Sequence, residues 1–118
     1  MRYAIVRADG THEVVESGDT PVNYKLFQKL VAAPSEEGKG FYQAIGGNLV
    51  SIYLNENGKY LSEELEVNVA VTRYARDNAL IWPNDYIMGD CVIMGLPDEE
   101  GEETEFDENT LNDIISYL

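Results

Sequence analysis

Residues 46–61, GGNLVSIYLNENGKYL, constrain the fold of this chain more than any other stretch. Asn57 and Gly58 both tolerate positive φ, which suits a two-residue type I′ turn between antiparallel strands. The pattern therefore predicts a central hairpin, with strands over 49–54 and 59–61 and with Gly58 at positive φ.

The predicted turn also sets which side chains of this hairpin face the core. A loop made of Asn57 and Gly58 would place Leu54 opposite Leu61 and Glu56 opposite Lys59. Side chains alternate between the two faces of a strand, so the apolar positions fall together. The predicted core face consists of Val50, Ile52, Leu54 and Leu61.

The N-terminal region predicts a second hairpin. Residues 2–8 and 11–17 have strand character and flank an Asp-Gly dipeptide, which is a strong hairpin signal. A two-residue loop would pair Ile5 with Val14. His12, the only histidine, is then expected at a solvent-exposed edge rather than in a metal site, because no Cys/His spacing supplies further ligands.

Four segments show helical signals. Residues 21–33 carry an apolar stripe behind Thr20 as the expected N-cap, and a proline follows them. Residues 41–45 are expected to form a short helix that ends at two glycines. Residues 68–78 fit both a strand and a helix, and we favour the helix. Residues 108–118 show a clear amphipathic pattern behind an aspartate cap.

The remaining residues complete an α+β prediction. Residues 86–95 read as a strand interrupted at Gly89-Asp90, where glycine indicates a bulge or a close backbone approach. Residues 97–108 contain eight carboxylates, from Asp98 to Glu108, and such a density of charge predicts a solvated loop. We therefore expect one α+β domain over 1–118, with two or three short helices packed on a mainly antiparallel sheet.

The charge of the chain restricts its partners. Twenty-two acidic and eight basic residues give a net charge of −14. Such a charge repels nucleic acid and anionic membranes and favours basic protein surfaces or cations. We expect no direct nucleic-acid or membrane partner, and the composition leaves the oligomeric state open.

The single cysteine, Cys91, lies in an apolar run and is predicted to be a buried, inert thiol. One cysteine fits a reducing compartment, and the N-terminal residues show no signal-peptide pattern, so a cytoplasmic location is expected. No catalytic motif is present, and a Cys91 nucleophile would have only His12 as its base. We therefore predict a protein that is not an enzyme and has no metal and no cofactor.

Several short motifs follow one another in an order that carries a family resemblance. They are Gly46-Gly47, Asn55-Glu56-Asn57-Gly58-Lys59, Asn68 with Ala70, and Gly89-Asp90. With the starting hairpin, this order resembles the domain-of-unknown-function family numbered 3846, whose members are small proteins common in phages, plasmids and bacterial genomes. The resemblance covers about residues 1–96. It implies the fold and a phage or mobile-element source, and it implies no activity.

Two functions are compatible with these observations. The first is a non-enzymatic protein-binding module, an accessory or counter-defence protein that engages a basic host protein. Its contact residues would be Glu99, Glu100, Glu102, Glu103 and Glu105. The alternative is a binding protein for a small polar, nucleotide-like ligand. Its pocket would involve Asn55, Asn68 and Asp90, for which turn formation and helix capping are the competing interpretation.

Overall fold

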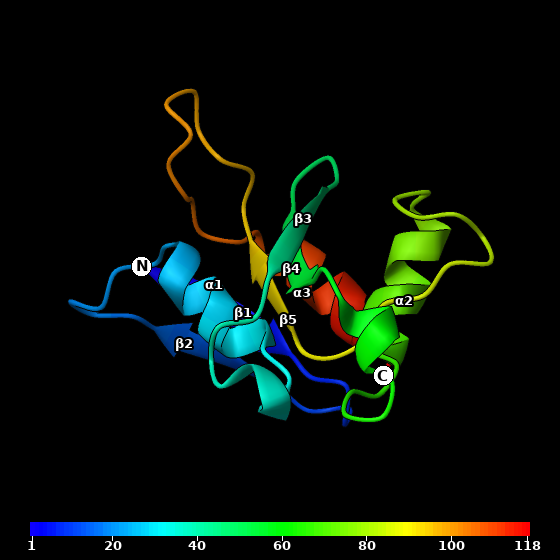
Figure 1. The fold of residues 1–118 in the computed structure, drawn as a ribbon. Helices are drawn as coiled ribbons and strands as arrows, with labels where there is room; N and C mark the ends of the chain where they lie inside the picture. Colours follow the sequence, from blue (N-terminus) through cyan, green and yellow to red (C-terminus); the bar gives the residue numbers. More distant parts are fainter.

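Five antiparallel strands form a single sheet in the computed structural model, which describes residues 1–118 (Figure 1). The strands are β1 (Arg2–Val6), β2 (His12–Glu16), β3 (Tyr42–Gly46), β4 (Ser51–Asn55) and β5 (Cys91–Met94). Their order across the sheet is β2-β1-β5-β4-β3. With three α-helices this makes a single α+β domain, as the sequence predicted.

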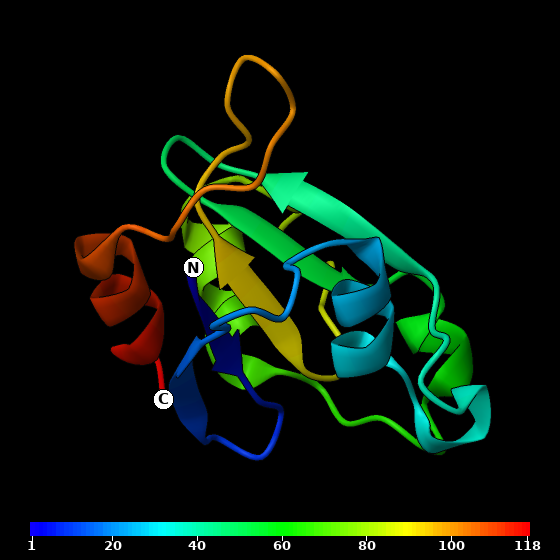
Figure 2. The same cartoon turned by 90° about the vertical axis from the view of Figure 1, so that its left-hand side faces the viewer.

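Helices cover both faces of the sheet. Helix α1 (Tyr24–Val31) packs on one face, and helices α2 (Val69–Asp77) and α3 (Glu108–Ile115) pack on the other (Figure 2). Two short 3-10 helices, η1 (Pro34–Glu36) and η2 (Gly58–Leu61), lie in the connections. None of these helices has the length and apolarity needed to cross a membrane.

The layered arrangement explains the burial of each strand. The middle strands β4 and β5 are buried at every residue because helices lie on both of their faces. One core cluster joins β1, β4 and β5 to α2 and α3, and the other joins the opposite face to α1. The border strands β2 and β3 are mostly exposed.

The predicted central hairpin is wrong beyond Asn55. Strand β4 pairs with β3 on one side and β5 on the other, so no side remains for residues 59–61. The Asn55 side-chain oxygen accepts a hydrogen bond from the Asn57 backbone N–H (2.8 Å), which bends the chain away from the sheet and into η2. Gly58 has no positive φ. A Cβ there would lie 3.0 Å from the Met88 Cβ, so close packing favours glycine instead.

The predicted core face of this hairpin is confirmed in part. Val50, Ile52 and Leu54 belong to one core cluster, on the side of α2 and α3. Leu61 lies in η2 and is only partly buried.

The predicted helix over 41–45 is also wrong. These residues largely form β3, which pairs with β4 along its whole length. Gly46 ends this strand, and Gly47 begins the hairpin loop, in which its N–H donates to the Val50 carbonyl (2.8 Å). A run of five residues is too short for helical periodicity to compete with a neighbouring strand that offers a full ladder.

The N-terminal hairpin is confirmed, but its register differs from the prediction by one residue. Ile5 faces Glu13 rather than Val14. The loop has three residues because the Arg7 N–H bonds to the Thr11 carbonyl (2.8 Å) and Gly10 takes a φ of +90°. A type I turn followed by a left-handed glycine is the common three-residue hairpin loop.

The helix predictions were correct for α2 and α3 and approximate for α1. Asn68 caps α2 by accepting from the Val71 N–H, and Asp107 caps α3 by accepting from the Thr110 N–H. The last helix ends at Ile115 rather than at the chain terminus. Helix α1 begins at Tyr24 behind Asn23, three residues later than expected, because residues 17–20 form a turn.

Candidate functional site

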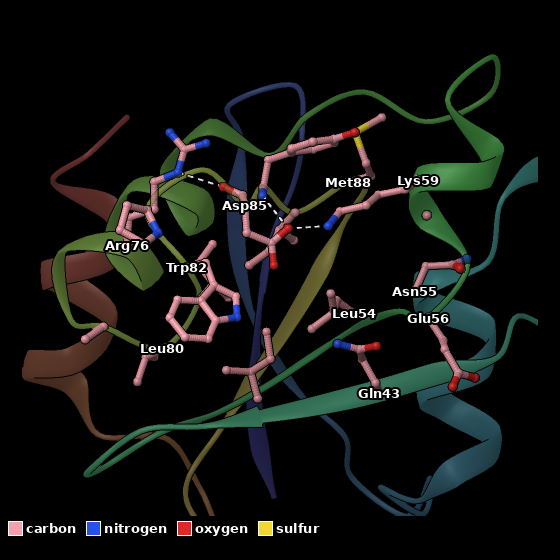
Figure 3. Close-up of a pocket in the computed structure, with 17 residues that line it drawn as sticks. Gln43, Leu54, Asn55, Glu56, Lys59, Arg76, Leu80, Trp82, Asp85 and Met88 are labelled. Atoms are coloured by element: carbon pink, nitrogen blue, oxygen red, sulfur yellow. Dashed lines mark hydrogen bonds and ion pairs between the residues drawn. The ribbon is translucent and has the colours of Figure 1, made fainter.

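A cleft of about 700 Å³ lies between the β3–β4 ribbon and residues 79–88 (Figure 3). It is on the same face of the sheet as α2 and α3, because Ile45 and Leu54 contribute both to this core and to the cleft. The two helices leave the β3 border of this face uncovered, and residues 79–88 only partly cover it. The cleft is therefore a consequence of the fold rather than of one loop.

The wall formed by residues 79–88 is fixed to α2 at both ends. Ala79 takes a left-handed φ of +57°, and the Leu80 N–H then donates to the Ala75 carbonyl (2.8 Å). Farther along, the Ile87 N–H donates to the buried Thr72 hydroxyl (3.0 Å). Between these points the chain turns at Trp82, whose carbonyl accepts from the Asp85 N–H (2.9 Å). These bonds hold the wall in one position.

Apolar and polar residues share the lining of the cleft, and its rim is aromatic. Its apolar surface is formed by Ile45, Leu54, Leu80, Ile81, Ile87 and Met88. Trp82 stands at the rim with 78% of its surface exposed, and Tyr86 is also exposed. A large ring that remains in water at the mouth of an apolar cleft is typical of a contact residue.

Three polar side chains are joined at one wall of the cleft (Figure 3). Lys59 forms an ion pair with Asp85, and its ammonium lies 4.9 Å from the centre of the Tyr86 ring. The Arg76 Nε donates to the Asp85 carbonyl (2.7 Å). The hydrogen bond from Lys59 lowers the pKa of Asp85, so this carboxylate is ionised at neutral pH. Lys59 and Arg76 thus place positive charge at this wall in a strongly acidic protein.

Strand β3 borders the cleft and has a free edge. The hydrogen bonds Glu56 N–H to Phe41 carbonyl and Gly47 N–H to Val50 carbonyl fix the alternation of the β3–β4 ladder. By that alternation, the N–H and C=O groups of Tyr42, Ala44 and Gly46 point away from β4. The β3 sequence, YQAIG, contains no charged residue, whereas the other border strand, HEVVE, contains two glutamates.

The three residues of the predicted ligand pocket do not meet around one cavity. Asn55 lines the cleft, but its amide donates to the Val31 carbonyl (3.0 Å) and to Glu36 (2.6 Å). Asn68 is fully buried and bonds to the carbonyls of β1 and Gly89. The Asp90 carboxylate accepts from the Ala8 N–H (3.1 Å). Each side chain has a structural role. Asn55 forms a turn and Asn68 caps α2, as the competing interpretation proposed, whereas Asp90 binds the distant β1–β2 loop.

The five glutamates of the acidic run fall into two groups. Glu99, Glu100 and Glu102 are exposed around a turn in which the Asp98 carboxylate accepts two backbone N–H groups. Two others are tied to the sheet: Glu103 accepts from the Tyr53 hydroxyl (2.9 Å), and Glu105 accepts from the Arg2 N–H (2.9 Å). This loop projects beyond the end of the sheet in Figures 1 and 2. It contributes no residue to the cleft.

Cys91 and His12 do not lie together. Cys91 is fully buried in β5, as predicted, and burial raises the pKa of its thiol. His12 is exposed on β2, and β1 separates the two strands. No group of three or more His, Cys, Asp or Glu side chains is placed to hold a metal ion.

The sequence predictions missed the main cleft residues: Lys59 was placed in the second strand of the predicted central hairpin, and Trp82 and Asp85 were not considered as site residues. One sequence signal for this site was available. Trp82 lies in a polar turn, where a tryptophan ring is not expected to be buried in the core. No protein-family model, curated protein or solved structure matches this chain.

Proposed function

We propose that this protein is a non-enzymatic, cytoplasmic protein-binding module that takes an extended segment of a partner along β3. One observation carries the proposal: an uncharged edge strand runs beside a partly apolar cleft with an exposed tryptophan at its rim. Extended peptides bind this combination by adding a strand to the sheet and placing alternate side chains in a neighbouring pocket.

Each part of the site has a separate energetic role in this proposal. The outward N–H and C=O groups of Tyr42, Ala44 and Gly46 offer main-chain hydrogen bonds that any extended sequence satisfies. The cleft supplies selectivity, because an apolar side chain of the partner would move out of water and pack on Leu54, Leu80 and Trp82. Trp82 has the size and position of a binding hot spot.

The net charge favours a basic partner. A charge of −14 attracts positively charged segments over a Debye length of about 8 Å at physiological salt. The exposed Glu99, Glu100 and Glu102 would raise the association rate, while the cleft would determine how long the complex lasts. Of the five glutamates predicted as contacts, these three are the ones free to act in this way.

The small-ligand alternative gains no support at the residues first suggested for it. Asn55, Asn68 and Asp90 have their polar atoms committed to backbone groups or to Glu36. We retain the resemblance to family 3846, and with it a phage or mobile-element source and a counter-defence role against a host protein, as part of the proposal.

The proposal is tested with peptides, because an extended segment needs no folded partner. A displayed library of random dodecapeptides would be selected on the protein, and the enriched peptides synthesised. Trp82 is the only tryptophan, so binding in the cleft should shift its fluorescence emission to the blue. We expect enriched peptides that combine basic residues with an apolar anchor. Trp82→Ala should weaken them at least about tenfold by calorimetry.

A matched pair of proline variants tests strand addition. Ala44→Pro removes an outward N–H from β3, and Val14→Pro removes the equivalent outward N–H from β2. We expect only Ala44→Pro to weaken the peptides, by about tenfold. In the unmodified protein, hydrogen exchange at Tyr42, Ala44 and Gly46 should slow when peptide is bound. Equal loss in both proline variants, or unchanged exchange at these amides, would contradict the proposal.

A further inference from the structure

A second concave surface, of about 650 Å³, lies on the α1 side of the molecule. We call it the lysine surface, and its main residues are Tyr24, Lys25, Lys29, Glu37, Lys39 and Phe41. It shares no residue with the cleft beside β3.

The charges of the lysine surface are not neutralised, although acidic residues greatly outnumber basic ones in this chain. Arg2, Arg7 and Lys59 each form an ion pair with a carboxylate. Lys25, Lys29 and Lys39 form none, and Glu37 is the only carboxylate that lines their surface. Three of the eight basic residues thus line one surface without an ion pair.

Two aromatic rings accompany these lysines. Tyr24 is 54% exposed and Phe41 is 62% exposed. They come from different segments, Tyr24 from the start of α1 and Phe41 from the chain that leads into β3. The surface therefore combines ammonium groups with ring faces that remain available for stacking.

The two segments are held firmly against each other. The Gly40 N–H donates to the Gln28 carbonyl (3.2 Å). A Cβ at Gly40 would lie 2.9 Å from the Ala32 Cα, so only glycine allows this approach. The positions of Lys39 and Phe41 relative to α1 are consequently fixed before any ligand arrives, which lowers the entropic cost of binding.

We propose that the lysine surface binds a nucleotide, with its phosphates at the three ammonium groups and its base stacked on Tyr24 or Phe41. Lysine suits phosphate as a point charge, and base stacking on exposed aromatic rings is favourable for any base. A single nucleotide fits better than a nucleic-acid strand, because a longer polyanion would extend over the acidic remainder of the surface.

The experiment compares three probes by amide NMR titration and calorimetry: ATP, adenosine and inorganic tripolyphosphate, all without divalent cations. We expect saturable ATP shifts confined to residues 24–41. Tripolyphosphate should bind roughly tenfold more weakly because it cannot stack. Adenosine should bind more weakly still. Trp82 fluorescence should not respond to ATP.

Two charge variants separate a local site from general electrostatics. Lys29→Gln and Arg73→Gln each remove one positive charge, and Arg73 is an exposed residue of α2 without an ion pair. Lys29→Gln should weaken ATP about fivefold, whereas Arg73→Gln should change it less than about twofold. Phe41→Ala with Tyr24→Ala should reduce ATP binding to the level of tripolyphosphate. Equal effects of the two charge variants, tripolyphosphate binding as tightly as ATP, or shifts centred on Lys59 and Arg76 would overturn the proposal.

Discussion

The junction around Asn68 and the cleft around Trp82 use their side chains in opposite ways. Asn68 has no exposed surface, and its amide joins β1, the chain before β5 and the first turn of α2. Trp82 is almost fully exposed and takes part in its turn only through its backbone. Polar residues can therefore be structural and apolar residues available for binding, which reverses the usual expectation from sequence.

This difference matters because the two regions are close in the chain and share α2. The junction fixes the start of the helix, and the wall of the cleft is fixed to the middle and end of it by Thr72 and Ala75. Rigid support from α2 lets the cleft expose apolar surface without local collapse. Substitutions should separate the two roles, with stability concentrated at the junction and binding at the cleft.

The largest effect on stability is expected at Asn68. Asn68→Ala removes the cap of α2 and leaves the Val6 and Gly89 carbonyls without their buried donor. The free energy of unfolding should fall by about 2–4 kcal/mol in urea denaturation. Asn78→Ala makes the same chemical change at the exposed end of α2 and should cost less than about 1 kcal/mol. Similar losses in both variants would contradict the assigned role of the junction.

Gly58 is expected to give the next largest effect, at the contact between η2 and the cleft. Gly58→Val should cost roughly 1–3 kcal/mol, because its side chain would enter the space of Met88. Gly101→Ala supplies the contrast, since Gly101 has a φ of +80° in open space, and strain alone should cost about 1 kcal/mol. Thermal melts measure both variants. An unchanged midpoint for Gly58→Val would mean that the Met88 contact is absent.

Gly58 also illustrates where sequence reasoning succeeds and fails. The cap and apolar stripe of α3 were predicted because their signals lie within the element itself, whereas the residues of α2 fitted both a strand and a helix. Asn-Gly was an equally local signal for a hairpin, but β4 takes its two partners from β3 and β5. The pairing of a strand depends on all the strands of the sheet, so a turn dipeptide alone does not predict it.

The cleft was not predictable for a related reason. Its residues come from β3, from the end of β4 and η2, and from the chain between α2 and β5. No periodicity or motif links segments so far apart, and the cavity exists only because the sheet is wider than its helical cover on that face. Cys91, by contrast, was predicted correctly because a continuous apolar run is itself the signal of a buried strand.

A third prediction concerns Tyr53, which joins the core to the acidic loop. Burial and the Glu103 carboxylate raise the pKa of Tyr53, so the folded protein keeps this phenol protonated. An unfolded tyrosine ionises near pH 10. The protonated Tyr53 phenol therefore contributes to the stability of the folded protein below about pH 10, and this contribution is lost as pH rises further. Tyr53→Phe should lower the free energy of unfolding by about 1 kcal/mol at pH 7. In urea denaturation above pH 10, the variant should lose less stability than the parent protein.

Tyr60→Phe is the control for this measurement because Tyr60 is 89% exposed. It should unfold like the parent protein at neutral and alkaline pH. If the free energy of unfolding of Tyr53→Phe fell with pH as steeply as that of the parent protein, the link between Tyr53 and Glu103 would not hold in solution.

The acidic loop should show a smaller effect, with opposite signs for its two groups of glutamates. Added salt, from about 10 mM to about 200 mM, should stabilise the protein by screening the repulsion among its acidic residues. Replacing Glu99, Glu100 and Glu102 by glutamine should raise stability at low salt by about 0.5 kcal/mol. Replacing Glu103 and Glu105 should lower it, because both accept hydrogen bonds from the sheet. Equal changes from both sets would mean that charge alone governs the loop.

The smallest effect on stability is expected at Trp82, where the effect on binding is expected to be largest. Trp82→Ala removes a mostly exposed ring whose side chain forms no hydrogen bond within the fold, so the free energy of unfolding should change by less than about 0.5 kcal/mol. Asn68→Ala should show the reverse pattern, with lower stability and, in the fraction that remains folded, unchanged peptide affinity. Urea denaturation and calorimetry with the selected peptides measure both quantities for each variant. A loss above about 2 kcal/mol in Trp82→Ala would show that the ring supports the fold. The cleft would then lose its main binding residue, and strand addition at β3 would have to account for affinity without it.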